Sequence, residues 1–326
     1  MRSIGLERIH EAAGAIYDTV VRTPLVRADL PGSSDLFLKL ELLQPVGSFK
    51  IRGAYNAVRR LPPAARAGGV WTVSAGNAAQ GVALAARQVG VPCSVLVFET
   101  APAAKLDAIE RLGAAIVTAS YDECWRTVET GASPRMTGRF VHPFDDDDFM
   151  AGNGTIGLEI LEDLPDVDVV IAAMGGGGLL CGLAAAVRAL RPGVRVLAAE
   201  PETAAPLAAS LAAGRPVAAP HWQASFVDGA GGRSVLPSMW PLLSRLVDGS
   251  IVVTLDEVRR AMKLTAERAH LVCEGAAGCA IAAAISGRAG PGRTVAVVSG
   301  GNIDLPRFAE LVGACENAWE QGTQTR

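Results

Sequence analysis

The sequence lacks the features expected of a membrane-spanning, secreted or nucleic-acid-binding protein. Charged residues or prolines interrupt every apolar run before about 20 residues, the length that a membrane-spanning helix requires. The N-terminal stretch has no continuous apolar segment behind its arginine, so we expect no secretion signal. The formal net charge is -3 and the pI is near 5.9, which gives no basic surface for nucleic acid or anionic lipid. We therefore expect neither nucleic acid nor a membrane as a partner.

Paired metal-binding residues are also missing. The cysteines contain no C-x-x-C pair of the kind that binds zinc, and most of them lie in apolar runs, as buried free thiols do. This usage favours the cytoplasm. The four histidines share no spacing typical of a metal site or a catalytic triad, so we interpret them as structural. The cysteines are Cys93, Cys124, Cys181, Cys273, Cys279 and Cys315, and the histidines are His10, His142, His221 and His270.

Short β-branched runs alternate with alanine-rich helical stretches along the chain. Residues 70–76 predict a strand that leads into a helix over 78–89, closed by Gly90 as a C-terminal cap. Further strands are predicted over 93–98, 114–119, 194–200 and 294–299. This alternation predicts an α/β protein with parallel sheets. The four aspartates at 145–148 interrupt the pattern and are expected to form a solvated loop without a catalytic role.

Lys50 lies at an unusual place for a lysine. The run 36–44 alternates like a strand, Gly47 permits a tight turn, and the spacing of Ile51, Ala54 and Val58 predicts a helix. The positive end of a helix dipole disfavours an ammonium group in its first turn. An amine that loses its proton near pH 7 can attack an aldehyde.

Three more joints between a strand and the following segment carry small or polar residues. The run MGGGG at 174–178 is a flexible turn or a phosphate cradle at a helix start. It is no P-loop, and a nicotinamide site remains a weaker alternative, with Glu200 as its acidic residue. The run SAGNAAQG at 74–81 is a helix cap or a carboxylate-binding loop, and SGGN at 299–302 ends the last strand. Such joints meet at one crevice in an open α/β sheet, which suits a phosphorylated aldehyde cofactor and an amino acid substrate.

These segments together resemble the fold-type II pyridoxal-phosphate enzymes, and within them the threonine/serine dehydratase and serine racemase group. The resemblance rests on GSFKIRGA, SAGNAAQG, GGGGLLCG, CEGAAG and SGGN, and it covers nearly the whole chain in one order. It implies a fold like that of the tryptophan synthase β subunit, with two open, twisted, mostly parallel sheets flanked by helices. A large cofactor-binding domain of residues 1–56 and 141–326 and a small domain of residues 57–140 are expected.

The resemblance also implies roles for single residues. Lys50 matches the catalytic lysine that binds the cofactor covalently, and the segment 74–78 matches the loop that holds the substrate carboxylate. Glu274 remains either a site carboxylate or a charge at a helix N-terminus. The implied cofactor-binding residues are Phe49, Lys50, Asn77, Gly175, Gly176, Gly177, Gly178, Gly229, Glu274 and Ser299, and the implied substrate-binding residues are Ser74, Ala75, Gly76, Asn77 and Ala78.

The function implied is the pyridoxal 5'-phosphate-dependent elimination of water from an L-β-hydroxy amino acid of the threonine or serine type. The products are a 2-oxo acid and ammonia. Ser299 fits this expectation, because a hydroxyl does not hold a proton on the cofactor ring nitrogen and so favours elimination over transamination. Alternatives are a dehydratase for phenylserine or hydroxyaspartate, a β-replacing synthase and a non-catalytic sensor. A homodimer is a family expectation.

The sequence departs from the family pattern at three places. Ala75 replaces the serine that racemases carry, which disfavours racemisation because a methyl group moves no proton. Ala78 replaces a frequent histidine and leaves room for a larger β-substituent. Glu200 matches the first carboxylate of a divalent-cation site, but Pro206 stands where a second is expected, so we predict weak or no metal binding there and assign no metal ligand.

Overall fold

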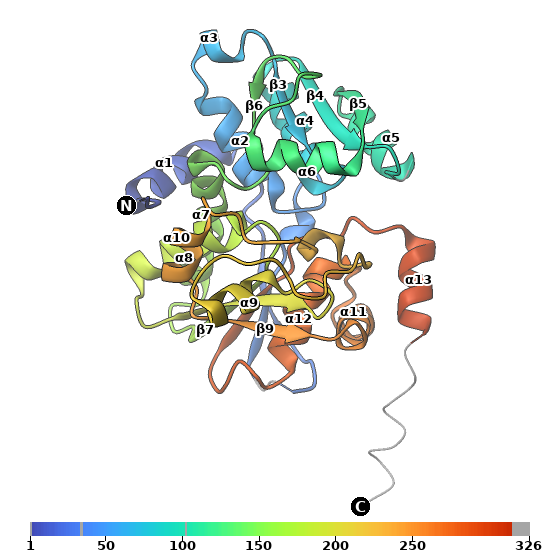
Figure 1. Ribbon diagram of the computed structural model, residues 1–326. Helices are drawn as coiled ribbons and strands as arrows, with labels where there is room; N and C mark the ends of the chain where they lie inside the picture. The colour runs from blue at the N-terminus through green and yellow to red at the C-terminus, as the bar shows by residue number, and fades with distance from the viewer. Residues whose placement is uncertain (1, 33–34, 102, 315–326) are drawn as a thin grey trace, which may run out of the picture.

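The computed structural model describes residues 2–32, 35–101 and 103–314 of the chain. Within these residues the chain forms a six-stranded and a four-stranded sheet, each flanked by helices (Figure 1). All neighbouring strands are parallel except the first pair of the larger sheet. The predicted α/β class with mostly parallel sheets is therefore confirmed.

The larger sheet is built from both ends of the chain. Its strands lie in the order β1 (Leu25–Ala28), β2 (Leu36–Lys39), β10 (Thr294–Val297), β7 (Val169–Ala173), β8 (Arg195–Pro201) and β9 (Gly249–Val253). Alternate residues of β7 face opposite sides, with Val170 in one core and Ile171 in the other. Both faces are covered, which is why the strands are apolar throughout rather than alternating.

Helices cover the two faces of this sheet in separate groups. One core contains residues of α7 (Asp147–Asp163), α8 (Gly178–Leu190) and α10 (Trp240–Leu246), and the other contains residues of α11 (Leu255–Ala269), α12 (Gly275–Ile285) and α13 (Leu305–Gly313). Helix α1 (Leu6–Ile16) packs on α7, and α9 (Pro206–Ala213) packs on β9. Two short 3-10 turns, η1 (Glu41–Leu43) and η2 (Asp228–Ala230), lie in the loops.

The smaller sheet lies at the top of the view in Figure 1. Its strand order is β5 (Ala115–Ala119), β4 (Cys93–Phe98), β3 (Val70–Val73) and β6 (Arg139–Phe140). Its helices are α3 (Pro63–Arg66), α4 (Asn77–Val89), α5 (Ala103–Arg111) and α6 (Tyr121–Thr130). Gly90 ends α4 in the left-handed conformation, with φ of 74°, as the sequence predicts.

Helix α2 (Lys50–Arg60) lies between the two parts and packs closely on both α4 and α7. Glycines permit the approach. A Cβ on Gly53 would lie 2.2 Å from the ring of Phe149, and one on Gly152 would lie 2.3 Å from the carbonyl oxygen of Arg52. On the other side, a Cβ on Gly81 of α4 would lie 3.1 Å from the carbonyl carbon of Lys50. The first turn of α2 is thus held from two directions.

Two local predictions are wrong. The strand predicted over 36–44 ends at Lys39, and the chain then turns through η1, because Glu41 is drawn into a buried ion-pair network described below. The aspartates at 145–148 do not form a solvated loop. Asp146 caps the N-terminus of α7, where its side chain accepts from the backbone N–H of Phe149 at 2.8 Å, and Asp147 and Asp148 lie in the first turn.

The five described cysteines are free and buried, and Cys315 lies outside the described residues. Among the described residues, none of the helices combines the length and the apolarity needed to cross a membrane.

Candidate active site

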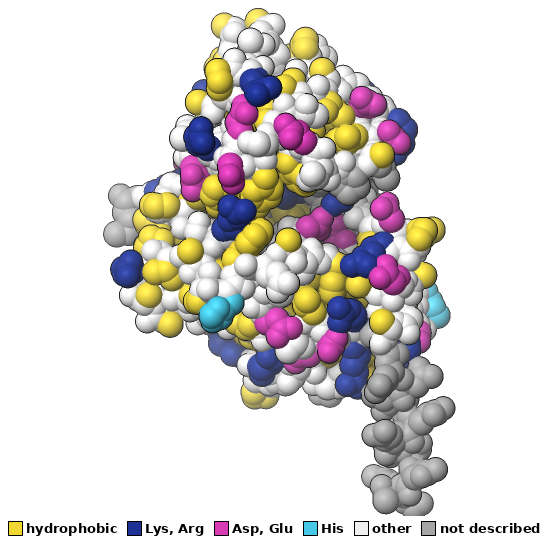
Figure 2. All heavy atoms as spheres, turned by 45° about the vertical axis from the view of Figure 1, so that its right-hand side comes forward, with side chains coloured by type: hydrophobic (Ala, Val, Ile, Leu, Met, Phe, Trp, Pro, Cys, Tyr) yellow, Lys and Arg dark blue, Asp and Glu magenta, His cyan; other side chains and the backbone are white. Residues whose placement is uncertain are grey.

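A cavity of about 730 Å³ lies between the two sheets. The face shown in Figure 2 is hollowed between the upper and lower parts of the molecule, and hydrophobic side chains gather in the hollow. The loops that follow β3, β7 and β10 line the cavity, as does the start of α2. Every residue expected at the site lines this one cavity, namely Phe49, Lys50, Ser74, Ala75, Gly76, Asn77, Ala78, Gly175, Gly176, Gly177, Gly178, Gly229, Glu274 and Ser299.

Lys50 lies in the first turn of α2, as predicted, and is the first residue of that helix. It lines the cavity. Its Nζ donates to the carbonyl oxygen of Pro143 at 2.8 Å and lies 5.2 Å from the ring centroid of Phe49. Burial lowers the pKa of Lys50 to about 8, while the charge of Glu274 opposes this shift. Roughly a fifth of the amine is therefore neutral and nucleophilic at pH 7.4, against about a thousandth for an ordinary lysine.

The glycine loop, residues 175–178, connects β7 to α8 and could not carry side chains. A Cβ on Gly176 would lie 2.3 Å from the ring of Phe144, and one on Gly175 would lie 2.6 Å from the carbonyl oxygen of Gly229. Gly177 has φ of 94°, a left-handed conformation that only glycine adopts at low cost. The loop opens the N-terminus of α8, where unpaired N–H groups and the helix dipole favour an anion such as phosphate.

The loop 74–78 follows β3 and leads directly into α4. The backbone N–H of Gly76 donates to Ser74 Oγ at 3.1 Å, which closes a turn within the loop. Ala75 and Ala78 are buried, whereas Ser74, Gly76 and Asn77 are half-buried. All five residues line the cavity at the start of α4, which is the place that a carboxylate-binding loop requires.

Asn77 belongs to a chain of polar contacts at the cavity wall. Its Nδ2 donates to Glu274 Oε1 at 2.8 Å, and its Oδ1 accepts from Asn302 Nδ2 at 2.8 Å. Burial raises the pKa of Glu274 to about 8, with a further contribution from the charge of Asp228. Glu274 precedes α12, yet its carboxylate points to Asn77 in the cavity. Lys50 and Glu274 influence each other's pKa, so they titrate as a coupled pair.

Ser299 lies two residues beyond the end of β10. Its backbone oxygen accepts from the N–H of Phe49 at 3.0 Å, so it is fixed beside the start of α2. Its Oγ is buried and has no hydrogen-bond partner among the described residues. Because an unpaired buried hydroxyl is costly, this atom calls for a partner in the cavity.

Glu200 does not lie in this site. Its carboxylate accepts from the backbone N–H groups of Leu207 and Ala208, each at 2.7 Å, and from Ser250 Oγ at 2.5 Å. It therefore serves the N-terminus of α9, which begins at Pro206. No cluster of three metal-ligating side chains occurs within 2–32, 35–101 and 103–314.

Sequence reasoning missed the residues that reach the site from the segment before α7. Pro143 supplies the acceptor for Lys50, and Phe144 packs on the glycine loop. Their only signal in the sequence is their place just before the aspartate run. Asn302 was also missed, although it ends the SGGN motif.

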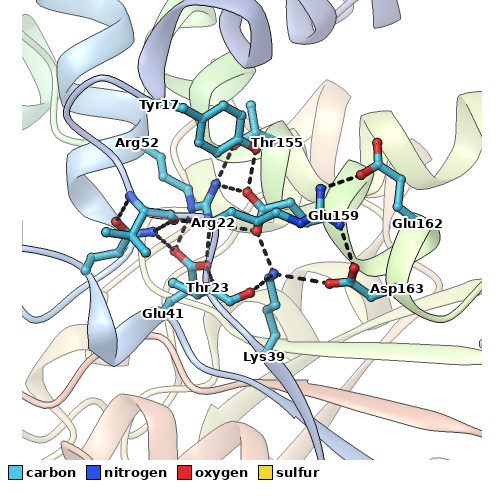
Figure 3. Close-up of polar contacts among 12 residues, drawn as sticks. Tyr17, Arg22, Thr23, Lys39, Glu41, Arg52, Thr155, Glu159, Glu162 and Asp163 are labelled. Carbon is cyan, nitrogen blue, oxygen red and sulfur yellow. Dashed lines mark hydrogen bonds and ion pairs between the residues drawn. The ribbon is translucent and has the colours of Figure 1, made fainter.

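A buried network of charges surrounds Arg52 and anchors α2 (Figure 3). Arg52 Nε donates to Glu41 Oε2 at 2.7 Å, and Arg52 Nη1 donates to Glu159 Oε1 at 2.6 Å. Lys39 Nζ lies 2.5 Å from Glu159 Oε2, and Tyr17 donates to the same carboxylate. Burial alone would raise the pKa of Glu159, but Arg52 and Lys39 outweigh it and hold that pKa below its usual value. The network ties α2 to η1, β2 and α7.

Comparison with known proteins places this arrangement in a family. The family model described as "Pyridoxal-phosphate dependent enzyme" matches residues 16–300. The chain is 38% identical to an L-threonine ammonia-lyase of Thermotoga maritima, over 95% of this chain and 78% of the relative. It is 36% identical to a catabolic L-threonine dehydratase of Staphylococcus aureus, over 95% of this chain and 92% of the relative.

Solved structures of similar fold include enzymes with related names. Maize serine racemase superposes with a TM-score of 0.86 at 33% identity, covering 95% of this chain and 97% of that chain. The processed form of threonine deaminase isoform 2 from Solanum lycopersicum gives a TM-score of 0.85 at 29% identity, covering 96% and 95% of the two chains. The chain belongs to the family of pyridoxal-phosphate dependent enzymes.

Proposed function

We propose that the protein eliminates water from an L-β-hydroxy amino acid of the threonine or serine type and releases a 2-oxo acid and ammonia. Two relatives that are 36% and 38% identical over 95% of the chain carry the names threonine dehydratase and threonine ammonia-lyase, which supports this reaction. The observation that carries the proposal is the convergence of a neutralisable lysine, a glycine loop and a carboxylate-binding loop on one cavity.

The residues present fit pyridoxal 5'-phosphate. The glycine loop at the start of α8 suits the phosphate, since it offers backbone N–H groups where side chains are sterically excluded. Ser299 Oγ, buried and unpaired, suits the ring nitrogen. Lys50 suits the aldehyde, Phe49 and Gly229 suit the edges of the ring, and Asn77, held by Glu274 and Asn302, suits the ring oxygen.

When bound, the cofactor supplies an electron sink that acidifies the Cα–H bond of the substrate. Residues of the chain bind the substrate and move its proton. Loop 74–78 holds the substrate carboxylate, and Lys50 Nζ, whose pKa is about 8, removes the Cα proton. The β-hydroxyl then departs, and with the proton taken from Cα it makes up the one water that is eliminated. Hydrolysis of the released enamine returns one water, so threonine yields 2-oxobutanoate and ammonia.

Ala75 supports elimination over racemisation. Ala75 lines the cavity, and its methyl group can neither donate nor accept a proton. We therefore infer that D-serine forms far more slowly than pyruvate when L-serine is the substrate. Chiral chromatography of the reaction mixture measures the ratio, and comparable amounts of both products would contradict the inference.

A bulkier β-hydroxy amino acid is a second candidate substrate. Ala78 adds little bulk, and the carboxyl edge of the smaller sheet brings Phe98, Tyr121 and Trp125 to the same cavity. The rings of Phe98 and Tyr121 lie 6.0 Å apart and form an apolar surface that suits a phenyl substituent. A screen of 2-oxo acid release across threonine, serine, phenylserine and hydroxyaspartate decides between the candidates.

The decisive test is the variant Lys50→Ala. Wild-type protein with the cofactor should show a visible absorption band and release a 2-oxo acid, and the variant should lose both. An unchanged spectrum would refute the role of Lys50. A bound cofactor without turnover would favour a sensor, and incorporation of an added thiol would favour a β-replacing synthase.

We also propose that the active protein is a cytoplasmic homodimer. The free, buried thiols support a reducing compartment. Light scattering after size-exclusion chromatography measures the oligomeric state, and cell fractionation tests the location.

A further inference from the structure

The segment between β6 and α7 forms a wall of the cavity that contacts two parts of the site at once. The carbonyl oxygen of Pro143 accepts from Lys50 Nζ at 2.8 Å. The next residue, Phe144, lies so close to the glycine loop that a Cβ on Gly178 would be 2.6 Å from its carbonyl oxygen and one on Gly176 would be 2.3 Å from its ring. A shift of this wall would therefore displace both the amine and the anion cradle.

His142 lies behind this wall and holds it through its imidazole ring. Its Nδ1 accepts from the backbone N–H of Asp145 at 2.9 Å and from that of Phe144 at 3.3 Å. A ring nitrogen that faces two N–H donors must offer its lone pair. The proton is therefore on Nε2, which donates to the carbonyl oxygen of Val128 in α6 at 3.0 Å.

The surroundings keep this single tautomer neutral. The ring stands nearly edge-on to Phe144 at 4.6 Å and to Phe140 at 5.5 Å, measured between centroids. Burial lowers the pKa of His142, and the charges of Lys50 and Arg2 lower it further, against the Val128 carbonyl and Asp145. If Nδ1 were protonated, its own N–H would face the backbone N–H groups of Phe144 and Asp145, and both hydrogen bonds to Nδ1 would be lost.

We propose that His142 is a positioning residue of the cofactor site, which holds the Pro143 carbonyl against Lys50 and Phe144 against the glycine loop. It acts from behind the cavity wall, and the backbone of residues 143–145 transmits its effect. The proposal rests on the proposed function only in assigning Lys50 and the glycine loop to the cofactor.

The test measures cofactor affinity rather than turnover. Cofactor-free protein is titrated with pyridoxal 5'-phosphate in equilibrium dialysis, for the wild type and for His142→Ala, His142→Asn and Val253→Ala. Asparagine restores the acceptor, because its side-chain oxygen accepts the backbone N–H two residues further on. Val253→Ala is the control for general destabilisation, since Val253 is buried in β9 and does not line the cavity.

His142→Ala should raise the dissociation constant about tenfold, the effect of losing one or two hydrogen bonds that fix the wall. His142→Asn should remain close to the wild type, and Val253→Ala should lower the melting temperature without changing the affinity. Unchanged affinity in His142→Ala, or an equal loss in His142→Asn, overturns the proposal. If His142→Ala does not fold, His142→Asn decides alone: retained affinity supports the proposal, and a tenfold loss overturns it.

Failure of this proposal can be told apart from failure of the proposed function. Wild-type protein that binds the cofactor but releases no 2-oxo acid refutes the dehydratase reaction and leaves the comparison of the His142 variants intact.

Discussion

Removing Arg52 should destabilise the protein more than removing any other charge on α2. The guanidinium makes two hydrogen bonds to Glu41, at 2.7 and 2.8 Å, and two to Glu159, at 2.6 and 2.9 Å. In Arg52→Met, Glu159 keeps Lys39 and Tyr17 as partners. Within the described part of the chain, Glu41 keeps neutral donors alone, namely Thr23 at 2.6 Å and Gln44 at 3.2 Å. A buried charge is thus left without a counter-charge.

The cost of such a break is about 3–5 kcal/mol, because the remaining ion stays desolvated. That is a large part of the roughly 5–15 kcal/mol that stabilises a typical domain. Urea unfolding of the cofactor-free protein, followed by circular dichroism, measures the loss. The matched control is Arg60→Met on the same helix. Its partners Glu11 and Asp148 are partly exposed, so the loss should stay below about 1 kcal/mol.

The double variant Arg52→Met with Glu41→Gln isolates the interaction. It removes the cation and the stranded anion together, so its stability should exceed the value expected from adding the two single losses. Strict additivity would refute the reasoning, as would a loss in Arg52→Met no larger than that in Arg60→Met.

Three further perturbations test the site itself. Gly176→Ala should abolish cofactor binding, because the added Cβ would lie 2.3 Å from the ring of Phe144. In the control Gly193→Ala the added Cβ meets no described atom within 4 Å, so this variant should bind the cofactor normally. Equilibrium dialysis compares the two affinities. The rate of covalent cofactor uptake, measured by stopped-flow absorbance, should rise with pH through about 8, where Lys50 loses its proton. Glu274→Gln should move this midpoint to lower pH, because the charge of Glu274 raises the pKa of Lys50. A midpoint near the ordinary lysine value would contradict the assignment. Ser299→Ala should leave the stability of the cofactor-free protein unchanged or increase it, because Ser299 Oγ has no partner among the described residues. The same variant should bind the cofactor more weakly. Lower stability in calorimetry together with unchanged affinity in dialysis would exclude Ser299 as a ligand.

Local signals account for the parts of the fold that the sequence predicts. The parallel strands, the Gly90 cap and the position of Lys50 at a helix start each follow from a few neighbouring residues. The same holds for the glycine loop, because four consecutive glycines between an apolar strand and a helix are conspicuous in the sequence itself.

The parts that the sequence does not predict depend on partners far along the chain. Arg52 and Glu159 are 107 positions apart, and Lys50 and Pro143 are 93 positions apart. The run 36–44 alternates like one strand, but the chain leaves the sheet after Lys39, and Glu41 pairs with Arg52, which lies outside the run. His142 carries no spacing signal, because its partners are backbone groups, which leave no mark in the sequence.

The position of α2 between α4 and α7 has a mechanical consequence. Glycines bring its backbone against both neighbours, so α2 is suited to act as the axis if the smaller sheet rotates over the larger one. Points near a rotation axis move least. A rotation about α2 would widen the mouth of the cavity and leave the amine of Lys50, on the first residue of that helix, almost still.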